Sequence, residues 1–419
     1  MTGNLEGSVE GPVEGRINIQ LLLQAGAANA VTLRSSRPQL AQKIMVGCSP
    51  ARAAERAGLM FSLCGKAQRI AAELACEAAQ NSAPDAQTYA AREQRVLIEA
   101  GLEHAWQLLL HWPQRLSDVT HNHITQNHML QNRASLAALR KASLDSQRFV
   151  AVLDDELRAV FLGENAADWL QRDLAAFDAW RQQAANVLTT SSLASSSDQS
   201  SASSSASSMA ALFSTKAAAD QGLAATPLLP PLDNCAVWSP AQCAALAQRA
   251  FADANFSAQP TWQGGAAETG AIARQQAQPL LAEWIARRGR GQGARLLARL
   301  IELAELPSRL KLRSGAVANA DVQAKVKINT KAFTLDDNVG LSLVETSRGV
   351  LMHCVRLADG KVADYRIVAP TEWNFHPAGP LQQALALLPA DADIVARAQA
   401  ICQSLDPCVA FEIDVVDLR

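Results

Sequence analysis

The sequence predicts an α+β fold that is predominantly helical, with small β segments near the N-terminus and around residues 341–370. Ala- and Leu-rich stretches with helical periodicity run from about residue 50 to 188 and resume over 241–306. Strand-like alternation appears instead in GLSLVETSRGVLMHCVRLADGKVADYRIV, where Asp359-Gly360 marks a hairpin turn. Helical periodicity over most of the chain and strand alternation over a minor part together predict the α+β class.

Three further segments complete the predicted order of elements. VEGRINIQLLLQAGAANAVTL, residues 13–33, predicts two short strands around a Gly/Asn turn. The Pro-rich ATPLLPPLDN marks a boundary, because proline is unfavourable inside a helix. A last helical segment over 380–405 leads to the C-terminal SLDPCVAFEIDVVDLR.

The chain is expected to divide into two halves around a serine-rich insert. Residues 1–188 form the N-terminal half, with a β segment followed by helices, and 226–419 form the C-terminal half. The insert, 189–225, has few apolar side chains to offset the entropy of ordering it, so we expect a flexible linker. The two halves are expected to pack together as one unit.

Composition and charge narrow the classes of partner. Thirty-eight basic residues nearly balance forty acidic ones, so the formal charge of -2 predicts neither nucleic acid nor an anionic membrane as a partner. The first fifteen residues resemble no signal peptide, and no apolar run approaches the length of a membrane span. We therefore expect a cytoplasmic protein whose eight cysteines are free thiols.

Two motif-like stretches have simpler explanations. HNHITQNH places His121, His123 and His128 together, but the spacing gives no i, i+4 pair of histidines and no carboxylate or thiol accompanies them, which favours a polar loop. RRGRGQGARLLAR lacks both the G-x-G-x-x-G spacing and the Lys-Ser/Thr of a phosphate loop, which favours a turn between helices.

Two cysteines are harder to dismiss. Cys64 lies in FSLCGKAQ near the start of the first helical region, and Cys408 lies in DPCVAF near the C-terminus. Each has a phenylalanine three positions away, Phe61 before Cys64 and Phe411 after Cys408. Each motif therefore looks like a Cys-x-x-Cys in which one thiol has been replaced by a phenyl ring.

These two motifs and four other segments resemble, in order, the large subunit of nickel-iron hydrogenases. VEGRINIQ is similar to that family's R-x-E-G-H-x-x-I, and FSLCGKAQ to its C-G-x-C-P-x-x-H. ETGAIAR is similar to E-V-G-P-L-A-R, ETSRGVLMH to E-A-P-R-G-x-L-x-H, VAPTEWN to V-P-T-T-W-N, and DPCVAF to D-P-C-x-x-C. The resemblance implies a hydrogenase large-subunit-like helical core over the chain apart from its serine-rich insert.

The resemblance also implies roles for five residues. Glu14 stands at the position of a glutamate that passes protons near the metals, and Arg348 at that of an arginine above the active site. Thr371 stands where a hydroxyl donates to a cyanide ligand on iron. Cys64 keeps a thiolate that bridges nickel and iron, and Cys408 keeps a thiolate that binds nickel alone.

The departures from the family pattern argue against catalysis. Phe61 and Phe411 replace the other two thiolates of the nickel site, and Gln68 replaces a histidine. Because a phenyl ring offers no lone pair to a metal, we expect no nickel and no enzymatic activity. With one bridging and one terminal thiolate left, either Cys408 moves toward the iron or a partner supplies the second thiolate; Cys402 is expected to be a core residue.

Degenerate homologues of this kind resemble the HupK-type, or HoxV-type, hydrogenase maturation proteins. That resemblance implies an assembly scaffold that transiently holds iron with cyanide and carbonyl ligands before transfer to the hydrogenase large subunit. Its partners would be that large subunit and other maturation proteins. The alternative is a metal-free binding module or chaperone for the same partners, in which both cysteines are remnants.

Overall fold

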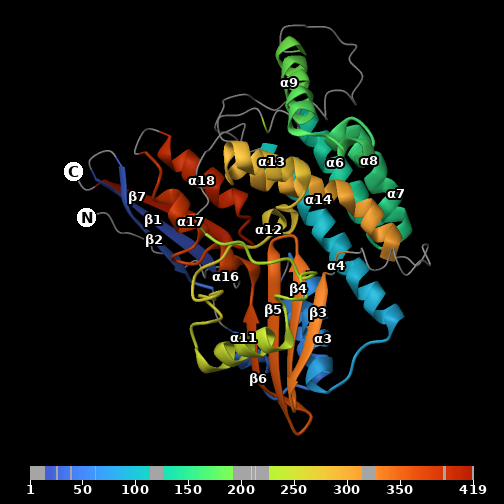
Figure 1. The fold of residues 1–419 in the computed structure, drawn as a ribbon, viewed down its shortest axis with the longest axis vertical. Coiled ribbons are helices and arrows are strands. Elements are labelled where there is room, and N and C mark those ends of the chain that lie inside the picture. The colour runs from blue at the N-terminus through green and yellow to red at the C-terminus, as the bar shows by residue number, and fades with distance from the viewer. Residues whose placement is uncertain are drawn as a thin grey trace, which may run out of the picture.

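The computed structural model describes residues 15–24, 27–37, 40–61, 63–113, 126–191, 209, 213, 226–313, 327, 329–389 and 393–417. For 27–29, 126–128 and 184–191 it describes the backbone alone. In these residues the protein combines a large helical region with two small sheets (Figure 1). The predicted α+β, predominantly helical class is confirmed. Glu14 lies outside the described residues.

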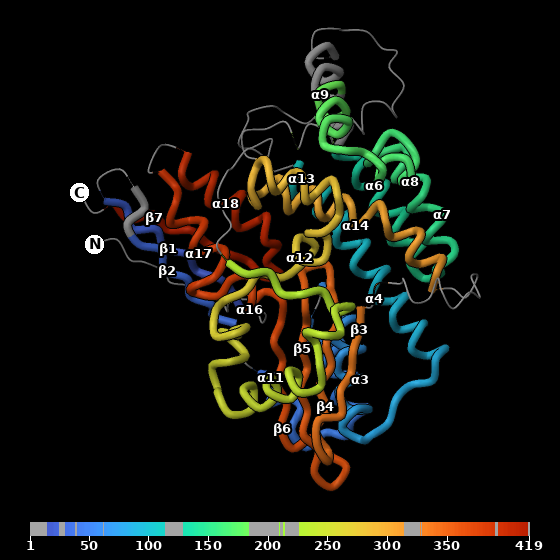
Figure 2. The backbone as a smooth tube through the Cα atoms, viewed as in Figure 1, coloured from blue at the N-terminus to red at the C-terminus, as the bar shows by residue number. Residues whose placement is uncertain are grey.

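The first sheet joins the two ends of the chain (Figure 2). Its order is β2 (Ala27–Ser35), β1 (Arg16–Gln24), β7 (Ala410–Asp417), with β1 antiparallel to β2 and parallel to β7. Apolar residues on one face of β1 are buried against the helices α17 (Pro380–Leu385) and α18 (Ile394–Ser404). The two N-terminal strands were predicted, whereas β7 was not.

The second sheet is an antiparallel meander of four strands, β3 (Thr330–Asp336), β4 (Val339–Thr346), β5 (Gly349–Ala358) and β6 (Lys361–Val368). The β5–β6 turn at Asp359 and Gly360 has positive φ at both residues, as a two-residue type I′ turn requires. One face packs on α2 (Pro50–Met60) and α3 (Gly65–Ala79), and the other on α11 (Pro240–Ala252). Because both faces are covered, β4 is buried along almost its whole length.

The helical region is built around α14 (Gln292–Arg313), most of which is buried, with α4 (Ala86–Trp106) beside it (Figure 1). The other helices and helical turns are α1 (Ala41–Met45), η1 (Gln107–His111), α6 (Gln126–Ala142), α7 (Ser146–Glu156), η2 (Leu157–Leu162), α8 (Ala166–Trp169), α9 (Leu174–Ser191), α12 (Ala271–Gln275), α13 (Pro279–Arg288) and α16 (Pro370–Asn374). The largest apolar core forms between these helices and contains residues from both sides of the serine-rich insert.

The structure corrects some of the predicted elements and confirms others. The single helical segment expected over 380–405 is two helices, α17 and α18, because the chain turns after Leu385. The glycine-rich stretch does form a turn between α13 and α14. Residues 126–128 belong to α6 and not to a polar loop, whereas 121–125 and almost all of the insert lie outside the described residues. Within the described ranges, no helix is both long and apolar enough to cross a membrane.

Candidate functional site

Cys64 lies at the N-terminus of α3, where two close contacts fix its position. The helices α2 and α3 approach so closely that a Cβ on Gly65 would lie 2.6 Å from the carbonyl oxygen of Gly58. The carboxylate of Glu99, on α4, accepts hydrogen bonds from the backbone N–H groups of Lys66 and Ala67, each at 2.9 Å. Glu99 thus satisfies two of the first N–H groups of α3, those of Lys66 and Ala67, which are therefore not available to the sulfur of Cys64.

Cys408 lies in the short connection from α18 to β7, which a buried carboxylate anchors. Asp406 accepts hydrogen bonds from Arg299 of α14 at 2.6 Å and from Gln107 of η1 at 2.5 Å. Burial alone would raise the pKa of Asp406, but the charges of Arg348 and Arg299 bring it below the ordinary value. The Asp-Pro-Cys turn is therefore held by ionic contacts from the helical region.

The structure brings Cys64 and Cys408 to one cavity, although they are far apart in the sequence. Arg348 and Thr371 line the same cavity, so four of the five residues singled out in the sequence meet there. The remaining lining residues are Arg37, Phe61, Gln68, Thr346, Leu351, Ala369 and Pro370. The volume open to the centre of a water molecule is only about 10 Å³, close to the space of one water.

Thr371 contacts one of the two thiols directly. It lies in the first turn of α16, and its hydroxyl oxygen is 3.0 Å from the sulfur of Cys408. The backbone N–H of Phe375 bonds to the Thr371 carbonyl, which ties the turn together. The Thr371 side chain is buried, so its hydroxyl has a fixed direction toward the cavity.

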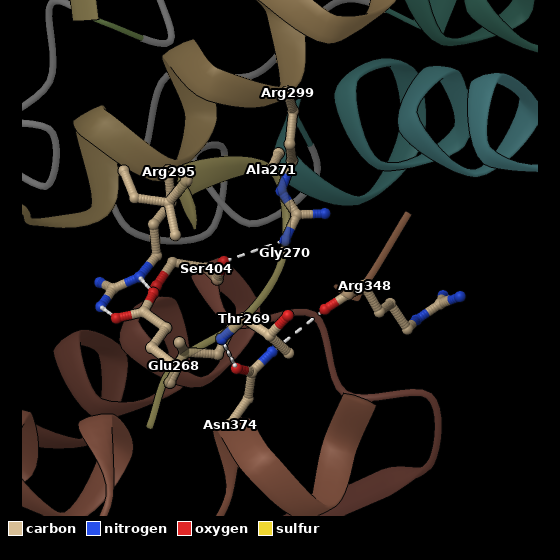
Figure 3. Close-up of a pocket in the computed structure, with 11 residues that line it drawn as sticks. Glu268, Thr269, Gly270, Ala271, Arg295, Arg299, Arg348, Asn374 and Ser404 are labelled. Carbon is tan, nitrogen blue, oxygen red and sulfur yellow. Dashed lines mark hydrogen bonds and ion pairs between the residues drawn. The ribbon is translucent and has the colours of Figure 1, made fainter. Parts of the chain in front are cut away.

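Arg348 is held in the β4–β5 turn from both of its ends. Its carbonyl oxygen accepts a hydrogen bond from Asn374, whose amide oxygen in turn accepts one from the N–H of Thr269 (Figure 3). Its guanidinium pairs with Glu103 at 2.9 Å and with Asp406 at 3.3 Å. Arg348 therefore bridges α4 and the Cys408 turn as a buried ion-pair partner while it also lines the cavity. Asn374 thus ties the β4–β5 turn to Thr269.

The glycine after Arg348 is required by this arrangement. Gly349 has φ +128°, and a Cβ added there would lie 2.3 Å from a side-chain carbon of Thr269. We expect Gly349→Ala to lower the free energy of unfolding by about 2–4 kcal/mol, because it adds both backbone strain and overpacking. Urea denaturation measures this difference.

The matched control is Gly264→Ala, since Gly264 has φ +84° and nothing within 4 Å of its added Cβ. That variant carries the backbone cost alone, about 1 kcal/mol. Equal losses in both variants would contradict a tight contact between the β4–β5 turn and Thr269.

The electrostatic environment favours the neutral thiol of Cys64. Burial raises the pKa of Cys64 to about 12, and the nearby charges of Cys408 and Glu99 act in the same direction. Arg348 and the hydrogen bond from Gln68 oppose this increase in pKa without cancelling it. A metal that binds Cys64 must therefore displace a proton.

The structure changes the expectation for one neighbouring residue, Phe411, and adds another residue, Arg37, to the site. Phe61 does line the cavity, but Phe411 lies on the face of β7 that packs against α17 and α18 and is not among the residues around the two thiols. Arg37, which follows β2, lines the cavity and lies 3.2 Å from Glu372, although no motif in the sequence singled it out.

The other cysteines are free thiols, as expected, and Cys402 is fully buried in the core. Among the described residues, no cluster of three or more His, Cys, Asp or Glu side chains is arranged to hold a metal. The candidate site therefore offers two thiols and hydrogen-bond donors, but no closed ligand set.

Known proteins resemble this chain in sequence and in fold. A model of the nickel-dependent hydrogenase family matches residues 253–413. The large subunit fold of the Ni-Fe-Se hydrogenase from D. vulgaris Hildenborough superimposes with a TM-score of 0.56 at 14% identity, covering 92% of this chain and 94% of that one. The likeness at this identity concerns the fold, which is hydrogenase-like as predicted.

Relatives of similar length carry a different name. The chain is 30% identical to the hydrogenase expression/formation protein HoxV of Cupriavidus necator, over 92% of this chain and 93% of that protein. It is 28% identical to the hydrogenase expression/formation protein HupK of Rhizobium leguminosarum bv. viciae, over 95% of this chain and 96% of that protein. The chain therefore belongs to the HoxV/HupK family of hydrogenase expression/formation proteins.

Proposed function

We propose that this protein is a non-catalytic scaffold in hydrogenase maturation, which transiently holds an iron fragment with cyanide and carbonyl ligands for transfer to the hydrogenase large subunit. The observation that carries the proposal is the meeting of Cys64 and Cys408 at one cavity together with Arg348. The iron fragment is cargo in this scheme and not a resident cofactor. The relatives named as formation proteins support the maturation role.

The chemistry of the cavity suits such a cargo. Two thiolates bind iron well and leave its other coordination positions to cyanide and carbonyl. The buried guanidinium of Arg348 and the hydroxyl of Thr371 supply hydrogen-bond donors for cyanide nitrogens, and Arg37 adds a further cationic group. Phe61 presents a phenyl ring where a nickel ligand would be needed, so the site favours iron without nickel.

Release requires a site that is not closed around the metal. Two protein ligands hold iron less firmly than the complete ligand set of a permanent centre, which suits a donor. Because the pKa of Cys64 is raised to about 12, iron must displace a proton from this thiol, which further weakens iron binding near neutral pH. Both properties favour a carrier over a permanent metal centre.

The cavity must widen to admit the cargo, since it has room for about one water molecule. Phe61 and Arg37 also line an adjoining cavity, bounded on its other sides by Leu40, Met60 and Glu372 among others. Displacement of the half-buried Phe61 ring would join the two cavities. We infer that the fragment reaches Cys64 from this side.

A second candidate function is a metal-free module that binds the apo large subunit or other maturation proteins. The small size of the cavity and the pairing of Arg348 with Glu103 and Asp406 favour it, because both describe a site that is stable without cargo. In this alternative the thiols have no part in partner binding.

The decisive experiment is infrared spectroscopy with metal analysis on protein purified from a host that expresses the whole hydrogenase maturation machinery. We expect iron with cyanide and carbonyl bands in the natural sequence and their loss in Cys64→Ala and Cys408→Ala. Cys402→Ala, which removes a fully buried thiol near the same end of the chain, should keep the bands. Unchanged bands in both of the first two variants would overturn the proposal, and full maturation by both variants would favour the metal-free alternative.

A further inference from the structure

We infer that Gln68, His353 and Tyr365 form a directed hydrogen-bond chain that fixes an amide N–H against the sulfur of Cys64. The three residues are thus positioning residues for that thiol. The inference deepens the proposed function, on which it rests for the statement that Cys64 is a metal ligand.

The chain is continuous and fully enclosed. The side-chain nitrogen of Gln68 lies 3.8 Å from the sulfur of Cys64, one turn earlier on α3, within range of an N–H···S hydrogen bond. The amide oxygen of Gln68 is 2.8 Å from Nε2 of His353, and Nδ1 of His353 is 2.8 Å from the hydroxyl of Tyr365. All three side chains have no exposed surface, so water does not compete for these bonds.

The chain draws its members from three elements that the fold brings together. Gln68 projects from α3 toward the sheet that this helix covers, while His353 lies in β5 and Tyr365 in the neighbouring β6. Burial lowers the pKa of His353 to about 3, so the ring is neutral and carries one N–H at physiological pH. A neutral histidine donates from one nitrogen and accepts at the other.

Tyr365 decides which nitrogen carries the proton. Among the described residues, its hydroxyl has Nδ1 of His353 as its one hydrogen-bond partner, and a buried O–H is costly to leave without an acceptor. The hydroxyl therefore donates to Nδ1, which places the ring proton on Nε2. That proton is donated to the amide oxygen of Gln68, and the amide NH₂ is left to face Cys64.

The direction of the chain matters for the sulfur. An N–H aimed at sulfur stabilises a thiolate and a metal-bound thiolate, whereas the amide oxygen in the same place would repel both. Tyr365 has no contact with the sulfur, yet it sets the group that the sulfur meets. The polarity of the network decides which group of Gln68 faces the sulfur, so the polarity is the property to test.

The tautomer of His353 is the first readout, and it requires no metal. Nitrogen NMR of protein labelled with ¹⁵N-histidine, assigned with a His353→Gln variant, should show the Nε2–H form in the natural sequence. Tyr365→Phe should lose this preference. The Nδ1–H form in the natural sequence would overturn the inference.

The behaviour of Cys64 is the second readout. In Gln68→Met and Tyr365→Phe, alkylation of Cys64 by iodoacetamide, measured relative to that of Cys408 in the same molecule, should slow roughly tenfold. The affinity for Cd²⁺ should weaken by a similar factor. Both effects are expected because one hydrogen bond to an anionic group is lost or reversed. Tyr89→Phe is the matched control, since it removes the only other tyrosine hydroxyl of the sequence. That hydroxyl donates to the Thr330 carbonyl at 2.6 Å and takes no part in the hydrogen bonds of Gln68, His353 and Tyr365.

The two proposals fail separately. Absence of iron bands from the natural sequence would remove the scaffold function but leave the tautomer and the alkylation ratio to decide the network. Unchanged alkylation and Cd²⁺ affinity in both Gln68→Met and Tyr365→Phe would overturn the network even if the iron bands are present.

Discussion

The affinity of this protein for a thiolate-binding metal ion such as Cd²⁺ is expected to rise about tenfold for each pH unit between pH 6.5 and 8.5. Burial and the charges of Cys408 and Glu99 raise the pKa of Cys64 to about 12, so the thiol is protonated throughout this range. The metal binds the thiolate, and each binding event must release that proton. Raising the pH lowers the cost of the release, so affinity increases up to the pKa.

Calorimetry in two buffers with different ionisation enthalpies measures the protons released directly, and we expect at least one for each Cd²⁺ bound. A competition titration at fixed free Cd²⁺ measures the slope of affinity against pH. Cys64→Ser should lose both the tight binding and the proton release assigned to that thiol. A pH-independent affinity in the natural sequence would show that Cys64 is either ionised already or not a ligand.

The fold was largely predictable because its local signals are strong. The Asp359-Gly360 turn and the alternation on both sides of it fix a hairpin without any tertiary information. The strand β7 was missed for the opposite reason. Its alternating Phe411, Ile413 and Val415 form a short pattern, and the strand that completes it, β1, lies at the other end of the chain.

The candidate site was predictable only in part. The motif resemblance identified Cys64, Cys408, Arg348 and Thr371, which the structure places around one cavity. Arg37 was not identified, since its approach depends on how β2 packs beside α16 and not on any local pattern.

Side-chain direction and ion pairs between distant residues could not be predicted from the sequence either. Phe411 points to the core because alternate residues of β7 face opposite sides, which a motif does not encode. The pairing of Arg348 with Glu103 and Asp406 joins three elements that are distant in sequence, so no spacing rule reveals it.

Arg274→Met is expected to cause the largest loss of stability, about 3–5 kcal/mol in the free energy of unfolding. The Arg274 guanidinium bonds both oxygens of Glu302, at 2.6 and 2.8 Å, and one oxygen of Glu345, at 2.6 Å. All three side chains are less than 10% exposed. Methionine fills a similar volume but leaves two carboxyl groups buried without their cation, which is costly because neither reaches water.

The two carboxyl groups do not contribute equally to this loss. The charge of Arg274 keeps the pKa of Glu302 well below its ordinary value, so that group is ionised in the natural sequence. The pKa of Glu345 is raised by burial, so this group accepts a proton more readily and limits its own share of the cost. We therefore expect the deficit of Arg274→Met to shrink as the pH falls and the carboxyl groups become neutral.

Urea denaturation at pH 7 and pH 5 measures both the deficit and its pH dependence. Arg287→Met is the control, because Arg287 pairs with Glu283 on the surface with 68% of its side chain exposed, and such pairs contribute at most about 1 kcal/mol. If both variants lose equally little stability, the buried cluster does not depend on Arg274.

The same cluster of ion pairs extends to the candidate site. Glu302 also bonds His104 of α4 at 2.9 Å, and the neighbouring Glu103 pairs with Arg348. Arg274→Met should therefore also weaken Cd²⁺ binding, because it loosens α4 against the β4–β5 turn.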